Sequence, residues 1–237
     1  MFARLAEDRF NLVVVGRFSR GKASLMNALL GRALLPTGIL PLTSVVTAVS
    51  HGSAPGVVLH HTDTSLTTDI PLKALADHVT ERGNLGNRRR VRIAKVRLPE
   101  ELLLRGFFLV DTPGFGSSVI ENTRTAEAFL PEADALLLVT SSDFPLSEEE
   151  LAVLRVARKA GRMAFVAVNK ADAASKAERT DVMLHLDGQL RLAFGTGTPP
   201  FFAVSTRDGL AAQLAGDAEP GTTRAAHRCL LADADGA

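Results

Sequence analysis

The sequence predicts an α/β fold in which a mostly parallel β-sheet carries helices on both faces, giving three layers. Three observations support this prediction. Short apolar runs alternate with helical stretches along the chain, as expected for parallel strands joined by crossover helices. A Gly-rich loop joins the first apolar run to the first helical stretch. Polar motifs follow several other apolar runs, at the strand ends where open α/β sheets bind ligands.

The elements follow from local pattern. The apolar run 10–16 predicts the first strand, and 22–31 predicts a helix that ends near Gly31. Residues 33–44 contain Pro and Gly and predict a mobile segment. The strong alternation over 88–98 predicts a strand near a sheet edge. Further strands are expected at 45–51, 56–61, 106–111, 134–140, 163–169 and 200–204. Further helices are expected at 72–81, 123–131, 147–160 and 175–194.

Length and composition limit the class of protein. The chain has 237 residues, 46% of them hydrophobic, which suits one large domain with a full core. A net charge of +1 gives no attraction toward nucleic acid or an anionic membrane. The single cysteine, Cys229, permits no internal disulfide and suits a reducing cytosol. No apolar stretch approaches the roughly 20 residues that cross a bilayer, and the first residues do not resemble a signal peptide.

The first motif is the Gly-rich loop after the strand 10–16. Gly16, four further residues, Gly21 and Lys22 match the phosphate-binding loop G-x-x-x-x-G-K-[ST], except that Ala23 replaces Ser or Thr. The glycines let successive backbone N–H groups face one anion, and the following helix directs its positive end to the same point. The loop predicts a P-loop NTPase with Lys22 on the outer phosphates. The alternative is a Gly-rich turn without a ligand.

A second motif, D-x-x-G, closes the strand 106–111. The carboxylate of Asp111 can hold Mg²⁺ through water, and the amide of Gly114 can meet the γ-phosphate. The D-x-x-G motif also follows an apolar strand. Its presence there makes it much less probable that the phosphate-loop pattern occurs by chance.

Two further motifs indicate the base. Asn169, Lys170 and Asp172 form an N-K-x-D motif after the strand 163–169. Asp172 can accept hydrogen bonds from guanine N1–H and the 2-amino group, which adenine does not offer, so the motif favours GTP over ATP. A Ser-Thr-Arg motif starts at Ser205, where a backbone N–H would meet guanine O6. Asn and Asp also favour strand-end turns, which is the alternative for this segment.

Ala23 predicts a damaged metal site. The Ser or Thr normally found there supplies a hydroxyl to Mg²⁺. Ser24 follows on the helix, but its side chain points roughly 100° away and cannot simply substitute. The sequence therefore predicts that GTP binds while Mg²⁺ binds weakly.

Four segments together resemble the bacterial dynamin-like GTPases. They are residues 16–31, 35–47, Asp-Thr-Pro-Gly-Phe-Gly-Ser at 111–117 and Asp-Phe-Pro-Leu-Ser-Glu-Glu-Glu at 143–150. The resemblance implies an extended G domain of a large GTPase, with a helical bundle and a membrane-binding tip elsewhere in the protein. We therefore expect three parts in this chain. They are the end of a preceding helix (1–9), the GTPase domain (10–215) and a tail with a bundle fragment near 223–232 (216–237).

The resemblance also implies residue roles. Catalysis falls to Ser19, Lys22, Thr43 and Gly114, with Thr47 as an alternative to Thr43. The metal residues are Thr43 and Asp111. The nucleotide-binding residues are Gly16, Ser19, Arg20, Gly21, Lys22, Ala23, Ser24, Asp111, Asn169, Lys170, Asp172 and Ser205. The chain departs from dynamins proper at Phe18, where those proteins use a glutamine.

The leading functional interpretation is a dynamin-like GTPase head that hydrolyses GTP to GDP and phosphate with Mg²⁺. The resemblance implies a homodimer that pairs across the nucleotide face to drive membrane remodelling. It also implies a cytoplasmic location, peripheral to the inner face of the membrane. Contact with the membrane would come only from regions outside this chain, and no nucleic acid is expected.

Two alternatives remain open. In the first, Ala23 weakens Mg²⁺ so far that the domain is a GTP-binding pairing module with little hydrolysis. The second is a ribosome-assembly GTPase, which would normally bring a basic RNA-binding segment, and the net charge of +1 argues against it.

Overall fold

The computed structural model describes residues 9–38, 45–62, 64–104, 106–114, 130–143 and 146–215. The strands are β1 (Phe10–Val15), β2 (Val46–His51), β3 (Gly56–His61), β4 (Thr67–Ile70), β5 (Val91–Leu98), β6 (Phe107–Asp111), β7 (Ala135–Ser141), β8 (Met163–Asn169) and β9 (Phe201–Ala203). The helices are α2 (Lys22–Leu30), α3 (Ala76–Val79), α5 (Glu148–Lys159), α6 (Lys176–Phe194) and α7 (Thr206–Ala215). Short 3₁₀ turns span Leu72–Ala74, Leu85–Asn87, Glu101–Leu103, Ala171–Ala173 and Gly195–Gly197.

The described strands form one sheet in the order β4-β3-β5-β2-β6-β1-β7-β8-β9. Strands β6, β1, β7, β8 and β9 are parallel to one another. Strand β2 is parallel to β5 but antiparallel to β6, and β3 is antiparallel to both of its neighbours. The mostly parallel α/β sheet is therefore confirmed. Because the five parallel strands end at one edge, the loops that follow them are brought together there.

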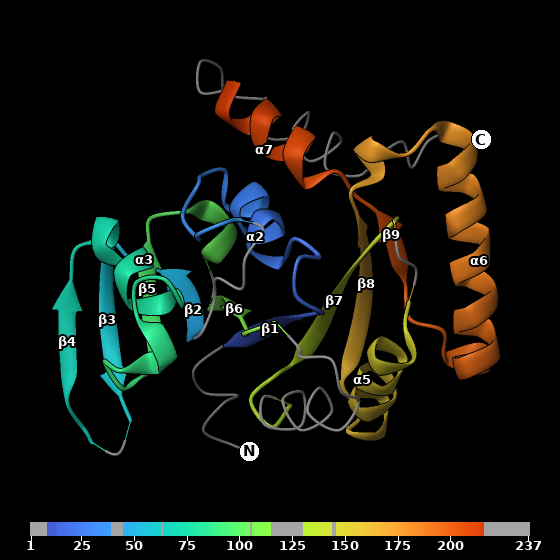
Figure 1. The fold of residues 1–237 in the computed structure, drawn as a ribbon. Coiled ribbons are helices and arrows are strands. Elements are labelled where there is room, and N and C mark those ends of the chain that lie inside the picture. Colours follow the sequence, from blue (N-terminus) through green and yellow to red (C-terminus); the bar gives the residue numbers. More distant parts are fainter. Residues whose placement is uncertain are drawn as a thin grey trace.

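Helices cover both faces of the sheet (Figure 1). Val14 of β1 belongs to the apolar cluster that includes residues of α2 and α3, with Leu210 of α7 packed against it. Val13 and Val15 belong to the second cluster, with residues of α5 and α6. Since successive side chains of a strand point to opposite faces, β1 is buried on both sides, which explains its continuous apolar run.

The helix starts differ in a way that bears on function. Ser147 and Glu150 form a capping box at the start of α5, and Ser175 and Glu178 form another on α6. The start of α2 follows Gly21 and has neither a side-chain cap nor an acidic residue in its first turn. The first N–H groups of α2 are therefore left for a ligand.

The structure corrects several expectations. The strand expected near a sheet edge is β5, which lies in the interior between β3 and β2. Arg92, Lys95 and Arg97 are exposed on it, and this charge alternation was mistaken for an edge pattern. The single helix expected over 72–81 is a 3₁₀ turn followed by α3. Neither β4 nor α7 was predicted. Residues 1–8, Thr43, most of the helix expected at 123–131 and the tail 216–237 lie outside the described residues.

A search of the helices in the described ranges finds none with the length and hydrophobicity needed to span a membrane.

Candidate nucleotide site

The phosphate loop joins β1 to α2 through backbone conformations that require glycine. Gly16 has a φ of 150° and Gly21 a φ of 92°. A Cβ at Gly16 would lie 2.3 Å from the Val139 carbonyl oxygen, and one at Gly21 would lie 2.2 Å from Asn169 Nδ2. Ser19 between them also adopts a positive φ, 65°, which is uncommon for a residue with a side chain. The loop is thus packed against both β7 and β8.

Lys22 lies inside the curve of this loop. Its Nζ donates hydrogen bonds to the carbonyl oxygens of Gly16 at 2.9 Å and Arg17 at 3.2 Å. Burial lowers the pKa of Lys22 from its ordinary value, and the negative charges of Asp111 and Glu150 oppose that shift. A desolvated ammonium group therefore stands where the motif places the outer phosphates.

The D-x-x-G motif is in contact with the phosphate loop. A Cβ at Gly114 would be 3.1 Å from Lys22 Nζ and 3.0 Å from Phe18 Cα, so only a glycine fits without movement. The hydroxyl of Thr112 donates to the carbonyl oxygen of Val14 at 2.9 Å. The backbone of Gly114 is therefore held beside the ammonium group of Lys22.

The side chain of Arg20 is directed toward β7 and α5. Its Nη1 donates to Ser141 Oγ at 2.7 Å, and its Nε lies 3.4 Å from Glu150 Oε1. Both charged side chains are buried. Arg20 was expected to contact the nucleotide. Because its side chain is engaged by Ser141 and Glu150, only its main chain is left for that contact.

Asn169 connects the base motif to the phosphate loop. Its Nδ2 donates to the carbonyl oxygen of Arg20 at 2.9 Å, and its Oδ1 accepts from the Thr206 amide at 3.3 Å. The resemblance assigns Asn169 to the base, and in the structure its amide also joins the end of β8 to the phosphate loop and to the start of α7. The positive φ of Lys170, 63°, turns the chain sharply after β8, and Lys170 Nζ lies 2.9 Å from Asp143 Oδ2.

Asp172, the carboxylate of the N-K-x-D motif, contacts two side chains of the Ser-Thr-Arg motif. Its Oδ1 accepts a hydrogen bond from Ser205 Oγ at 2.9 Å, and its Oδ2 lies 2.9 Å from Arg207 Nη2. The two predicted base motifs therefore meet at one carboxylate. Arg207 is the last residue of the Ser-Thr-Arg motif, and the sequence did not predict a role for it in the site. Nothing in the local pattern indicates which acid an exposed arginine pairs with.

Among the described residues, the metal position has the carboxylate of Asp111 but lacks the hydroxyl that the motif places after Lys22. The methyl group of Ala23 packs against the first apolar cluster. Asp111 is buried, and Thr47 lies directly opposite it in the β2–β6 pairing. The hydroxyl of Thr47 is buried and has no hydrogen-bond partner among the described residues. In those residues no group of three or more His, Cys, Asp or Glu side chains could hold a metal ion. One carboxylate still suits Mg²⁺, which usually binds through one or two carboxylates with phosphates and waters.

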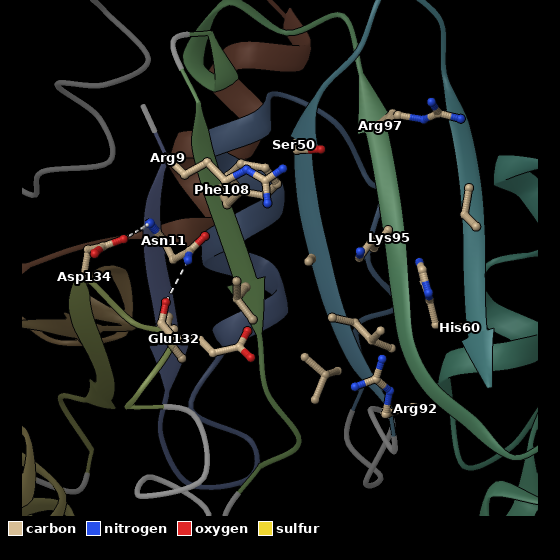
Figure 2. A pocket seen from close by; sticks show the side chains of 16 residues that line it. Arg9, Asn11, Ser50, His60, Arg92, Lys95, Arg97, Phe108, Glu132 and Asp134 are labelled. Carbon is tan, nitrogen blue, oxygen red and sulfur yellow. Dashed lines mark hydrogen bonds between the residues drawn. The ribbon is translucent and has the colours of Figure 1, made fainter. Parts of the chain in front are cut away.

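A separate hollow of about 650 Å³ lies on the sheet face away from α2 (Figure 2). Lys95 and Arg97 of β5 line one side of it, and burial together with Lys95 and Arg92 lowers the pKa of the nearby His60. On the other side the Arg9 guanidinium lies over the ring of Phe108, 5.5 Å from its centroid. No residue of the four motifs lines this hollow, so it is not the nucleotide site.

The family model described as "Dynamin family" matches residues 12–171, which include the phosphate loop and the N-K-x-D motif up to Ala171. The chain belongs to the dynamin family. Members of this family are GTPases, and the chain is a dynamin-type GTPase domain.

Sequence relatives agree with this assignment. The chain is 33% identical over 217 residues, 91% of its length and 54% of the relative's, to an uncharacterized protein in the xynA 3' region of Caldicellulosiruptor. It is 28% identical over 150 residues, 60% of its length and 22% of the relative's, to a bacterial dynamin-like protein of Nostoc punctiforme. The chain thus spans about half of the first relative and less of the second.

A solved structure shares the fold. It is described as an oligomerised bacterial dynamin pair that provides a mechanism for sensing and tethering membranes. Its TM-score with this chain is 0.73 at 16% identity, covering 96% of this chain and 38% of that one. At this identity the likeness supports the fold alone.

Proposed function

We propose that this domain binds GTP at the carboxyl edge of its sheet and hydrolyses it to GDP and phosphate. The observation that carries the proposal is the convergence of distant motifs on one loop. Asn169 reaches the Arg20 carbonyl across 149 positions, and Gly114 lies beside Lys22 Nζ. A Gly-rich turn without a ligand has no need of a buried ammonium group or an uncapped helix start.

In this mechanism the chain binds and orients the substrate. Lys22 and the first N–H groups of α2 bind the β- and γ-phosphates, and the Gly114 amide donates to the γ-phosphate. Asp172 accepts from guanine N1–H and the 2-amino group. Asp111 would hold Mg²⁺ through water, and the ion would neutralise charge on the β- and γ-phosphates. Thr43 is proposed to orient the attacking water.

A GTP-binding domain with slow hydrolysis is the second candidate. It is favoured by Ala23, which has no hydroxyl at the position where the motif supplies a metal ligand. In that case GTP binding, rather than turnover, would control the domain.

Pairing and membrane action are proposed at the level of the whole protein. The structural neighbour is described as an oligomerised bacterial dynamin pair that tethers membranes. By analogy, we propose that two heads pair across the nucleotide face, and that regions outside this chain contact the membrane. We further propose that the whole protein acts at the inner face of a membrane, as a peripheral component.

The test is nucleotide binding by calorimetry together with phosphate release. GTP is expected to bind at least tenfold more tightly than ATP, because adenine offers Asp172 neither an N1–H nor a 2-amino donor. Lys22→Ala should lower GTP affinity at least tenfold. Asp172→Asn should weaken GTP and admit xanthosine triphosphate, whose 2-oxo group accepts from an amide. Equal binding of ATP and GTP, or a Lys22→Ala variant with unchanged affinity, would contradict the proposal.

A further inference from the structure

The base carboxylate already has a cationic partner in this structure. Asp172 Oδ2 lies 2.9 Å from Nη2 of Arg207, the second residue of α7, while Ser205 Oγ donates to Oδ1. Both oxygens that guanine would use are therefore engaged. We propose that Arg207 occupies the guanine position at Asp172 in the nucleotide-free protein, and that guanine must displace it. This inference rests on the proposed function.

The chemistry of the two groups supports competition. Guanine presents N1–H and a 2-amino group on one edge, and these nitrogens share a carbon, as the nitrogens of a guanidinium do. A guanidinium can therefore present a similar donor edge with a positive charge added, and here one nitrogen of it, Nη2, contacts Asp172 Oδ2. Adenine has a lone pair at N1 and no 2-amino group, so it cannot replace the arginine at Asp172.

The exposed fractions of the two side chains show which of them can leave the ion pair. The Asp172 side chain is 11% exposed, whereas that of Arg207 is 74% exposed. Arg207 also has a second carboxylate within reach, because its Nε lies 3.5 Å from Asp208 Oδ1. The arginine can move to that neighbour without losing ion pairing, while Asp172 stays in place with Ser205.

The displaced contact makes a measurable difference to binding. Guanine nucleotides must break the ion pair before Asp172 is available, so removing the arginine should speed association and raise affinity. Ion pairs with an exposed partner contribute up to about 1 kcal/mol, which corresponds to about a two- to fivefold effect. ATP does not use Asp172, so its affinity should not rise and the preference for guanine should widen.

The experiment measures association and dissociation of methylanthraniloyl-GDP by stopped flow, which avoids hydrolysis. Arg207→Ala is expected to raise the association rate and the affinity about two- to fivefold, with an unchanged dissociation rate. The difference should shrink at high salt, since screening weakens the ion pair. Arg207→Lys should give an intermediate rate, because an ammonium group keeps the positive charge but not the planar guanidinium geometry.

Arg191→Ala is the matched control. Arg191 Nε lies 2.6 Å from Asp187 Oδ2 on α6, and its side chain is 71% exposed. The Arg191→Ala substitution removes a similar ion pair away from the motifs. The association and dissociation rates of the nucleotide should therefore stay unchanged.

The outcomes separate this inference from the proposed function. Saturable binding by the unaltered protein with equal rates in Arg207→Ala overturns the inference and leaves the proposed function standing. Faster dissociation in Arg207→Ala also overturns it, because the arginine would then hold the bound nucleotide. A lack of saturable binding by the unaltered protein contradicts the proposed function and this inference with it.

Discussion

Lys22 and Ala23 are adjacent in the phosphate loop but are expected to affect different steps. Lys22 should affect phosphate binding, and Ala23 should affect metal-dependent turnover. Lys22 is buried with its ammonium group held by loop carbonyls, so its charge is directed into the loop. Ala23 is half-buried and packs against the apolar cluster. We therefore expect phosphate binding to depend on the first residue and metal-dependent turnover on the second.

GTP affinity should fall as the pH rises through the lowered pKa of Lys22. Burial sets this pKa below the ordinary value of 10.5, and bound phosphates favour the charged form. Binding therefore takes up a proton, and affinity is greatest below the pKa of the unliganded protein and declines above it. Calorimetry over a pH series in two buffers would measure both effects.

Lys22→Arg is the control for that series. A guanidinium stays charged throughout the range, so the part of the decline due to Lys22 should disappear. The guanine base also titrates at high pH, and the comparison of the two proteins removes its contribution. Identical pH profiles would contradict the assignment.

Ala23→Ser should raise turnover and sharpen its dependence on Mg²⁺. The added hydroxyl would restore the missing metal ligand of the motif, while in the proposed site the amides, Lys22 and Asp172 bind GTP without it. Phosphate release at a series of Mg²⁺ concentrations would measure the change. Ala23→Gly, which alters the position without adding a hydroxyl, should not raise the rate. If the serine variant matches the unaltered protein, metal binding does not depend on this position.

At the scale of elements, the start of α5 supports the phosphate loop. Glu150 is fully buried, and its Oε2 accepts from the Ser147 amide at 3.0 Å as part of the capping box. Its other oxygen lies 3.4 Å from Arg20 Nε, so one carboxylate serves both the helix start and the loop. Ser141 at the end of β7 holds the same guanidinium. The loop's shape therefore depends on α5 and β7 as well as on its own glycines.

Glu150→Gln should lower the free energy of unfolding by about 3 kcal/mol or more, because it removes the negative charge of Glu150 from beside the buried Arg20 guanidinium. GTP affinity should fall with it, since Arg20 is part of the loop. Denaturant unfolding and calorimetry would measure the two effects.

The matched control is Glu148→Gln on the same helix. Glu148 pairs with Arg155 at 3.3 Å, but its side chain is 75% exposed, so the change should be within about 1 kcal/mol. Equal effects of the two substitutions would contradict a supporting role for the buried pair.

At the scale of the whole molecule, the sheet topology gathers the motifs at one edge. Five parallel strands end there, and four of them lead into the motif loops. Phe18 lies on this edge, in the phosphate loop, with 38% of its surface exposed. Aromatic residues, Phe among them, are enriched in protein interfaces. If two heads pair across the nucleotide face as proposed, we expect Phe18 to contact the partner head.

Phe18→Ala should weaken pairing of the heads at least about fivefold, measured by analytical ultracentrifugation with a non-hydrolysable GTP analogue. Leu192→Ala is the control, because Leu192 is 91% exposed on α6, away from the motifs. Nucleotide binding should be similar in both variants. Dimers of equal strength in the two variants would contradict a role for Phe18 in pairing.

Much of the fold and of the candidate site could be predicted from the sequence, because their signals are local. The apolar run 10–16 predicted the strand β1, and the helices expected at 147–160 and 175–194 correspond to α5 and α6. The strand-end motifs indicated one ligand edge, since parallel strands share it. Gly16 and Gly21 were identified as essential to the loop, and their φ values and close contacts explain why.

Only the tertiary structure decided the contacts between distant segments. Strand β5 is interior because β3 and β4 extend the sheet beyond it, which its own alternation cannot reveal. Arg20 contacts Glu150, 130 positions away, and the Asn169 side chain contacts the Arg20 carbonyl, 149 positions away. Asp172 pairs with Arg207, 35 positions away. A side chain pairs with the charge or carbonyl that folding brings nearest. Periodicity and spacing therefore located the site, while packing determined what each polar group in it contacts.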